Sequence, residues 1–318
     1  MRRDQRKSIV ALALAAILAP FCGTAAAVQQ DAAPLRLQFE PGRTFTMEMT
    51  LDQQISQTLF GQEQQMTQVM EMTYGVAVEG VDAAGNGLVN WTYDAVRFEV
   101  NGPMGRLVYD SADPTAEVSP LLQGYAAFVG RSFRARTTPR GKVLEVSGFE
   151  EILQALLQDM ELPPGPEADA VRAQLEAQLG DQAMQELLTR MLAVYPDGPV
   201  AIGESWGSQL SVTSGYPMTV DATYTLNERR SGLAIIGVAA TVQSTPGAPP
   251  MEMYGMNLSF DLAGDQAGTI EVDLESGWVV RGELQQNFSG QVSVSGGQAG
   301  EGMQWPMAIT GTMKLQSR

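Results

Sequence analysis

Methionine is the residue type in this chain whose spacing most clearly suggests a binding chemistry. The chain contains 17 methionines, and several stand two residues apart, which places both members of a pair on one face of a strand. Thioethers are soft ligands that suit copper(I), and their flexible side chains also form adaptable surfaces for apolar ligands. The simplest interpretation is that they fill the core of a sheet, and copper is the least favoured. The candidate ligand-binding residues are Met47, Met49, Met70, Met72, Met251, Met253 and Met256.

Carboxylates are the other groups that could do chemistry, because the chain has no histidine and one cysteine, Cys22. Ser-His-Asp and Cys-His nucleophile systems are therefore excluded, as is a zinc site of the usual nitrogen and sulfur ligands. A glycosidase needs two carboxylates that face one cleft, and no acidic pair in the sequence is placed that way by its spacing. We predict no catalytic residue, no metal site and no cofactor. The pairs considered are Asp110 with Asp113, Glu150 with Glu151, and Glu271 with Asp273.

The first 27 residues have the pattern of a secretory signal peptide. Four basic residues precede the apolar run 9–18, and Ala25 and Ala27 supply the small residues that a signal peptidase reads. The run is shorter than the roughly 20 apolar residues of a spanning helix, and no later segment qualifies, so we expect no transmembrane segment. A lipoprotein acylated at Cys22 is disfavoured because bulky Phe21 precedes it. We expect a periplasmic or extracellular protein, cleaved after Ala27.

Charge restricts the possible partners. The formal net charge of the whole chain is −16, and removal of residues 1–27 changes it to −19. An acidic chain is repelled by phosphate backbones and by anionic lipid surfaces, so nucleic acid is not an expected partner. The only cysteine leaves with the signal peptide, and a mature chain without disulfides must be held together by its hydrophobic core.

The remaining sequence divides into three parts by the period of its apolar residues. Residues 28–148 alternate as strands do, as in Phe45, Met47 and Met49. Residues 149–196 change to helical spacing, with apolar stripes over 149–160 and 171–195. Residues 197–318 return to strands, including separate strands over 253–262 and 269–274. We predict an α+β fold, mainly antiparallel β, in which one or more long-stranded, curved or barrel-like sheets carry a helical insert packed on or capping them. The two β-rich halves are expected to form one compact unit.

The two β-rich halves contain similar motifs in the same order. Gly42 precedes Phe45 by three residues, and Gly203 precedes Trp206 by the same interval. The turn 139–141 likewise corresponds to the turn 275–277. Two related β units joined by a helical insert would explain this order, but glycine turns and alternation are common to all antiparallel proteins.

Several motifs of this sequence resemble motifs of a known family. They are Phe39-Glu40-Pro41-Gly42-Arg43-Thr44-Phe45, Val108-Tyr109-Asp110-Ser111, Phe128-Val129-Gly130-Arg131-Ser132-Phe133, Ile202-Gly203-Glu204-Ser205-Trp206 and Asp273-Leu274-Glu275-Ser276-Gly277-Trp278. Their order resembles an uncharacterised family of exported bacterial proteins, a domain of unknown function with β-rich, helical and β-rich parts. That resemblance implies no activity and no site residues. The predicted architecture is also similar to periplasmic lipoprotein carriers of the LolA type, in which a curved sheet and helices enclose an apolar cavity.

These observations leave three hypotheses for function. The first is an exported, non-enzymatic protein that binds an apolar small molecule, a lipid or an envelope protein. The second is a structural or cell-envelope interaction protein whose core is filled. The third and most remote is a carboxylate-dependent hydrolase, for which positioned acid and base partners are not visible.

The signal-peptide assignment predicts the mass of the mature protein. We expect the exported chain to begin at Val28, which intact-mass spectrometry of the protein recovered from outside the cytoplasm would show. A lipid-modified chain that begins at Cys22 would contradict the assignment.

Overall fold

The computed structural model describes most of the chain after the predicted signal peptide. It describes residues 32–318 apart from 60, 104, 114–121, 160–164, 166–171, 174–175, 177–179, 213–216, 254–255 and 297–301. The predicted signal peptide, 1–27, lies outside the described residues. Residues 32–318 form one compact unit.

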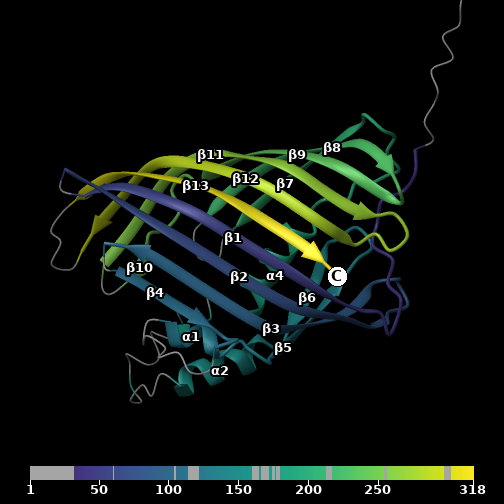
Figure 1. Cartoon of the computed structure of the whole chain (residues 1–318), viewed down its shortest axis with the longest axis horizontal. Coiled ribbons are helices and arrows are strands. Elements are labelled where there is room, and N and C mark those ends of the chain that lie inside the picture. Colours follow the sequence, from purple (N-terminus) through teal and green to yellow (C-terminus); the bar gives the residue numbers. More distant parts are fainter. Residues whose placement is uncertain are drawn as a thin grey trace, which may run out of the picture. The chain divides into compact units, whose positions relative to one another are not determined.

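One large antiparallel sheet dominates this unit (Figure 1). Its strands, as far as the chain is described, run in the order β6-β5-β3-β2-β1-β13-β12-β11-β9-β8-β7, with β4 beside β3 and β10 beside β11. The predicted fold class, a mainly antiparallel α+β fold with a curved, long-stranded sheet, is confirmed. The strands are β1 (Thr44–Leu59), β2 (Gln62–Val81), β3 (Gly87–Gly102), β4 (Gly105–Asp110), β5 (Ser132–Thr137), β6 (Val143–Ser147), β7 (Ser205–Val212), β8 (Met218–Arg230), β9 (Leu233–Ser244), β10 (Met251–Met253), β11 (Met256–Asp273), β12 (Val279–Ser295) and β13 (Met303–Ser317).

The sheet consists of two meanders joined by the first and last strands. In each half, successive long strands are neighbours, and the halves meet where β1 pairs with β13. One irregularity of the first half also has a counterpart in the second half. The β2–β3 register shifts between Val78 and Gly80 and the β8–β9 register between Leu226 and Glu228, in each case just before the connecting turn. The similarity of the two halves therefore extends from sequence motifs to backbone irregularities, and a duplication remains a hypothesis.

The prediction of separate strands over 253–262 and 269–274 was wrong. β11 runs without a break from Met256 to Asp273 and pairs with β12 and β9. The intervening Gly264 and Gly268 favoured a loop in the sequence. In the sheet they face large side chains, since Gly264 lies opposite Phe288 and Gly268 opposite Leu284. Glycine inside a strand often marks such a close approach of a neighbouring backbone.

The helices pack against one face of the sheet, and two of them lie in the segment that connects its two edge strands. They are α1 (Gln123–Ala126), α2 (Phe149–Asp159) and α4 (Asp181–Met191). The Gln185 side chain of α4 donates to the carbonyl of Val143 on edge strand β6 (3.0 Å). Trp206 on the other edge strand, β7, donates to the carbonyl of Val194, just beyond α4 (3.1 Å). The part of the insert that is described thus bridges two strands that do not pair with each other. None of the described helices is both long and apolar enough to cross a membrane.

The extended segment 32–43 lies across the turns at one end of the sheet. The amide of Leu37 donates to the carbonyl of Pro139 in the β5–β6 turn, and that of Gln38 to Ser276 in the β11–β12 turn (both 2.8 Å). Leu35 and Leu37 are buried. Tyr195 ties the segment after α4 to the same end by donating to the carbonyl of Gly277 (2.6 Å). This end of the sheet is therefore covered by chain from three separate regions.

The distance between neighbouring strands predicts which glycines tolerate a side chain. A Cβ at Gly290 would collide with the backbone oxygen of Asp261, whereas one at Gly282, on the same face of β12, would meet Ile270 and Leu315 at an ordinary 3.7 Å. We expect Gly290→Ala to lower the free energy of unfolding by about 1–3 kcal/mol, because the neighbouring strand must move.

Gly282→Ala is the matched control and should change the free energy of unfolding by no more than about 1 kcal/mol. Urea denaturation of both variants measures the difference. Equal losses would show that the approach of β11 to β12 does not depend on glycine.

Candidate ligand-binding face

The two faces of the central sheet differ sharply in composition. Residues 49, 51, 53 and 55 of β1 point to the inner face, the face that packs on α2 and α4, and each is half-buried. Alternate residues such as Asp52 and Gln54 are exposed on the outer face. In β12 the residues alternate in the same way, with Leu284, Gln286 and Phe288 inward. The inner face therefore holds the apolar residues of the long strands.

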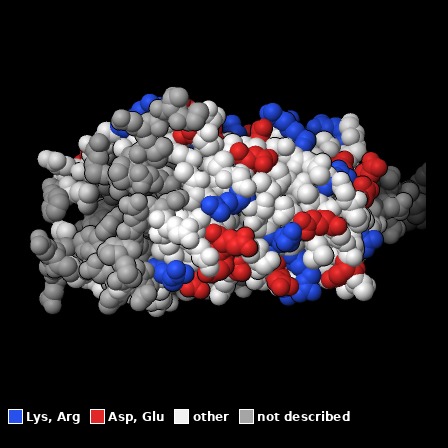
Figure 2. Space-filling model, turned by 90° about the horizontal axis from the view of Figure 1, so that it is seen from below, with Lys and Arg blue, Asp and Glu red and all other residues white. Residues whose placement is uncertain are grey.

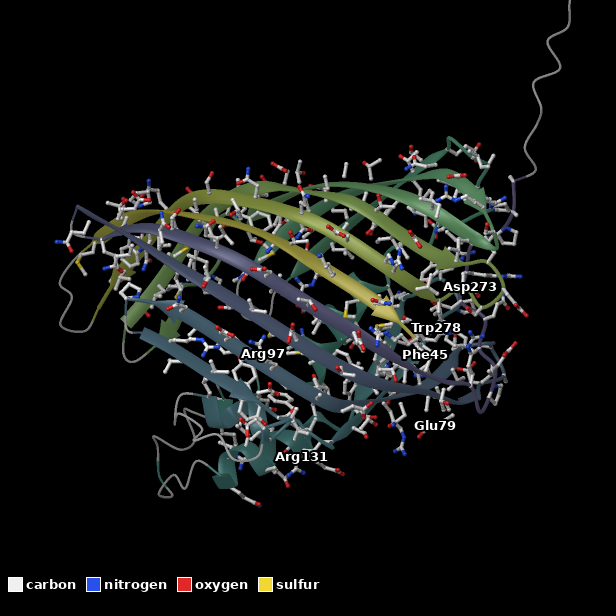
Figure 3. The ribbon with its side chains drawn as sticks, in the orientation of Figure 1. Phe45, Glu79, Arg97, Arg131, Asp273 and Trp278 are labelled. Atoms are coloured by element: carbon white, nitrogen blue, oxygen red, sulfur yellow. The ribbon has the colours of Figure 1, made fainter. Side chains whose placement is uncertain are left out.

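One end of the inner face is densely filled, and we call it the packed end. Its aromatic rings are in contact: Phe45 lies 4.9 Å from Trp278, and Trp91 stacks on Phe133 at 6.3 Å between ring centroids. Figure 3 shows Phe45 and Trp278 side by side. Met47 is 2% exposed and belongs to this core. Met47 therefore fills the core.

The methionine face adjoins the packed end. We use this name for six half-buried residues of the inner face, and no described segment covers them completely. Met49 pairs with Met72 of β2 and with Leu315 of β13, and Leu51 pairs with Met70 and with Met313. Three strands thus contribute two successive rows of apolar side chains. The methionine face consists of Met49, Leu51, Met70, Met72, Met313 and Leu315.

Tyr74 marks the boundary between the packed end and the methionine face. Its ring lies 4.9 Å from that of Tyr93 and 6.0 Å from that of Trp91. Its hydroxyl donates to the Sδ of Met72 (3.0 Å). Burial raises the pKa of Tyr74 to about 12. This hydroxyl stays protonated at neutral pH and fixes the position of the Met72 thioether.

Leu51 was not among the candidate residues, and sequence reasoning also missed two further members of the face, Met313 and Leu315. They lie on the last strand, and only the antiparallel register of β13 with β1 brings them beside Met49 and Leu51. The search for methionines two residues apart could not find Met313, whose nearest methionine in the chain is Met307. The alternation of Met313 with Leu315 was the one feature of the sequence that could have identified these two residues as members of an apolar strand face.

The candidates Met251, Met253 and Met256 lie elsewhere in the sheet. Met253 pairs with Met256 across the β10–β11 hairpin, and Met251 pairs with Leu258. The row of Met251 and Leu258 continues through β12 to Met303 of β13. Met303 is twelve residues along β13 from Leu315 of the methionine face. At 3.3 Å per residue this separation is about 40 Å. The seven candidates therefore form two separate groups, and the structure describes the backbone but not the side chains of the second group.

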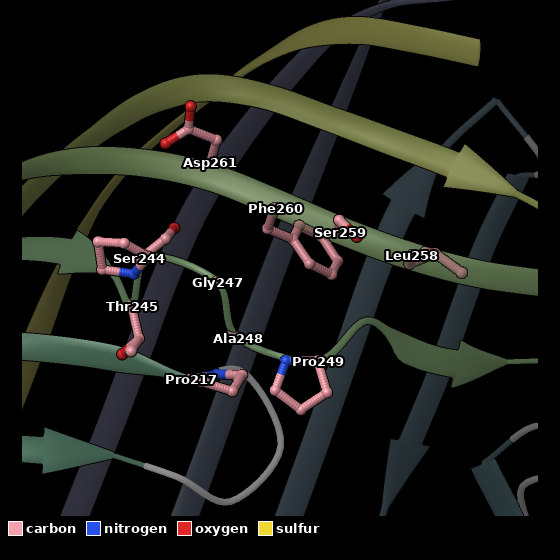
Figure 4. Close-up of a pocket in the computed structure, with 11 residues that line it drawn as sticks. Pro217, Ser244, Thr245, Gly247, Ala248, Pro249, Leu258, Ser259, Phe260 and Asp261 are labelled. Atoms are coloured by element: carbon pink, nitrogen blue, oxygen red, sulfur yellow. The ribbon is translucent and has the colours of Figure 1, made fainter. Parts of the chain in front are cut away.

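Two pockets of the structure can be compared with the candidate methionines, and none of their described lining residues is one of these methionines. One, of about 340 Å³, is lined by the 244–249 turn, Pro217 and residues 258–261 (Figure 4). The other, of about 460 Å³, lies between the β5–β6 turn, the segment after α4 and β7. Arg140 at its rim forms a 3.2 Å ion pair with Asp197. Both are separate from the methionine face.

Two of the candidate carboxylates, Asp273 and Asp110, accept hydrogen bonds within turns. Asp273 accepts from the amide and hydroxyl of Ser276 (2.7 and 2.6 Å) in the β11–β12 turn, and Asp110 accepts from the amide of Ala112 (2.9 Å). Among the described residues, no cluster of three or more acidic side chains could hold a metal ion.

Arginines on the outer face hold further carboxylates in an ionic network. Arg97, labelled in Figure 3, contacts Glu99 and lies 3.2 Å from Glu71 and 3.9 Å from Asp110. Arg106, with Arg97, holds the pKa of Glu99 below its usual range. A catalytic acid needs the opposite shift. Figure 2 shows basic and acidic side chains interspersed over the face it presents.

These observations define the class of the protein: an α+β protein, mainly antiparallel β, with one curved sheet that is polar on its outer face, apolar on its inner face and bridged by helices. Comparison of the sequence with known families refines this assignment. The chain belongs to a family of unknown function, DUF6263, whose model matches residues 84–279. This range contains β3 to β11 and the helices, while β1, β2 and β13 lie outside it. No curated protein was found to match the chain.

The buried Tyr74 hydroxyl predicts how stability depends on alkaline pH. Its pKa is about 12 in the folded protein and about 10 in an unfolded chain. Folding therefore favours the protonated form, and this contribution is complete below pH 10 and is lost as the pH rises towards 12. The full shift corresponds to about 3 kcal/mol.

Tyr74→Phe should reduce the decline of the free energy of unfolding between pH 10 and 12, as measured by urea denaturation at fixed pH. Tyr195 and Tyr93 are also buried with raised pKa, so part of the decline should remain. Identical profiles for the wild type and the variant would rule out a buried, neutral Tyr74.

Proposed function

We propose that this protein is an exported, non-enzymatic binding protein that holds an apolar ligand against the methionine face. One observation carries the proposal: six apolar side chains from three strands remain half-buried on the inner face, directly beside a packed core. Apolar surface of this kind is stabilised when a ligand removes it from water, by about 25 cal/mol per Å². The signal-peptide pattern supports a periplasmic or extracellular location.

The side chains of the methionine face suit a ligand of variable shape. Thioethers have three flexible torsions and adapt to irregular apolar surfaces. The packed end supplies a rigid base, because Met70, Met72 and Leu315 are packed against the main core. The face therefore combines adjustable contact atoms with fixed strands. This combination agrees with the likeness to LolA-type carriers that the predicted architecture suggested.

The alternative of an envelope interaction protein with a filled core is favoured by the packed end. There Met47, Trp91 and Trp278 are almost fully buried, which leaves no room for a ligand among these side chains. If the same dense packing continued over the methionine face, the protein would bind no apolar molecule, and its partners would be proteins that contact its surface.

A hydrolase is the least supported function. Glu99 and Asp273 are held by arginines or by a turn, and neither faces a second carboxylate across a pocket among the described residues. Acid–base catalysis needs two groups with opposed pKa shifts at one site.

Binding of a hydrophobic fluorescent dye to residues 28–318 tests the proposal. The wild-type protein should take up the dye, and native mass spectrometry should find adducts of apolar molecules. Met70→Gln combined with Met313→Gln should weaken dye binding about tenfold or more, because two adjacent contacts become polar.

Two double variants serve as controls. Met70→Leu with Met313→Leu keeps volume and apolarity, and Thr50→Gln with Thr312→Gln changes the outer face of β1 and β13. Both should bind as the wild type does. A bare polypeptide mass together with no dye uptake by the wild type would refute the proposal and favour the filled core.

A further inference from the structure

A row of glutamines crosses the inner face beside the methionine face. The registers of five adjacent strands place Gln68, Gln53, Gly311, Gln286 and Gln266 directly opposite one another. We call the four glutamines the glutamine band. With neighbouring strands about 4.8 Å apart, the row spans about 19 Å. Four long polar side chains on an apolar face are unusual, because burying an amide without a hydrogen bond is costly.

Small residues give the band room in the row. Gly311 lies between Gln53 and Gln286, and a Cβ there would stand 3.1 Å from the Cγ of Gln53, so this glutamine leans over the glycine. Beyond Gln266 the row continues with Ala240 and Ala222, both buried.

The amide of Gln286 is buried and only half satisfied. The residue is 8% exposed. Its Oε1 accepts from the Nε2 of Gln266 (3.2 Å), but its own Nε2 has no hydrogen-bond partner among the residues that the structure describes. An orphan donor of this kind costs roughly 1–3 kcal/mol unless an acceptor reaches it. Within the band, the Nε2 of Gln286 is therefore a buried donor that an acceptor from outside the described chain could satisfy.

Apolar rows lie on both sides of the band. On one side are Leu51, Met313 and Leu284, and on the other Ile55, Ile309 and Phe288. From Gln286 to Gly282, beside the packed end, the strand rises about 13 Å. A bound molecule along the strands would thus meet an apolar stretch, then a hydrogen-bond donor, then another apolar stretch.

We propose that the ligand is an acyl amphiphile, a hydrocarbon chain with an ester or amide carbonyl, and that Gln286 Nε2 donates to this carbonyl. The chain lies over the methionine face, and its end points to the packed end. This inference rests on the proposed function and adds the chemical class of the ligand. A pure hydrocarbon would leave the Gln286 donor unsatisfied.

Two fluorescent probes of equal length test the inference: a pyrene-labelled alkane and the matching pyrene-labelled acyl ester. The full-length mature protein should bind the ester about tenfold more tightly, the size of one satisfied buried hydrogen bond. In Gln286→Leu this preference for the ester over the alkane should disappear. Because Gln286→Leu also removes the acceptor of Gln266 Nε2, it should lower the free energy of unfolding by about 1–3 kcal/mol, which urea denaturation checks.

Gln285→Leu is the control, because Gln285 is the next residue of β12 and is exposed on the outer face; its preference should equal that of the wild type. Equal binding of the two probes by the wild type would overturn the carbonyl assignment and leave the proposed function standing. A preference that survives in Gln286→Leu would overturn the role of Gln286. Failure of both probes to bind would overturn both the inference and the proposed function.

Discussion

The antiparallel pairing of β1 with β13 is the interaction on which the rest of the structure depends. It joins a strand near the start of the described chain to its last strand over most of their length, from Met47 opposite Ser317 to Gln57 opposite Met307. Without it the protein would be two separate meanders, each with another exposed edge. Side chains alternate between the two faces along a strand, so a slip of the register by one residue would move every inward apolar residue of that strand to the outer face. This pairing creates the methionine face and completes the glutamine band.

The inner face is densely packed at one end and only half-buried farther along, because different segments pack opposite the sheet in the two regions. At the packed end, segment 32–43, α2, α4 and the chain around Tyr195 bring apolar groups that fill the space against the sheet. The long strands extend beyond these segments, and there the inward side chains of β1, β2 and β13 remain half-buried. The same alternation of residues thus produces a core in one region and a candidate binding face in the next. The difference lies in what packs opposite the sheet.

Close packing of strands limits which residues the inner face can hold. Gly264, Gly268, Gly290 and Gly311 stand where a Cβ would collide with the backbone of a neighbouring strand, and large residues such as Phe288 and Leu284 lie opposite. This exchange of small for large residues allows a sheet of long strands to curve. It also explains why Gly264 and Gly268 suggested a loop in the sequence, since the need for a small residue comes from the neighbouring strand.

The sequence by itself determined the fold class and the placement of Met47 and Met49 on one face of a strand, because these follow from local periodicity. Only the tertiary structure decided which of the seven candidate methionines lie together. It placed Met47 in the core, joined Met49, Met70 and Met72 to Met313 and Leu315, and set Met251, Met253 and Met256 apart. Nor could the sequence align Gln286 with Gln53 and Gln266. Such neighbours are fixed by the register between strands distant in the chain, and alternation within one strand contains no information about that register.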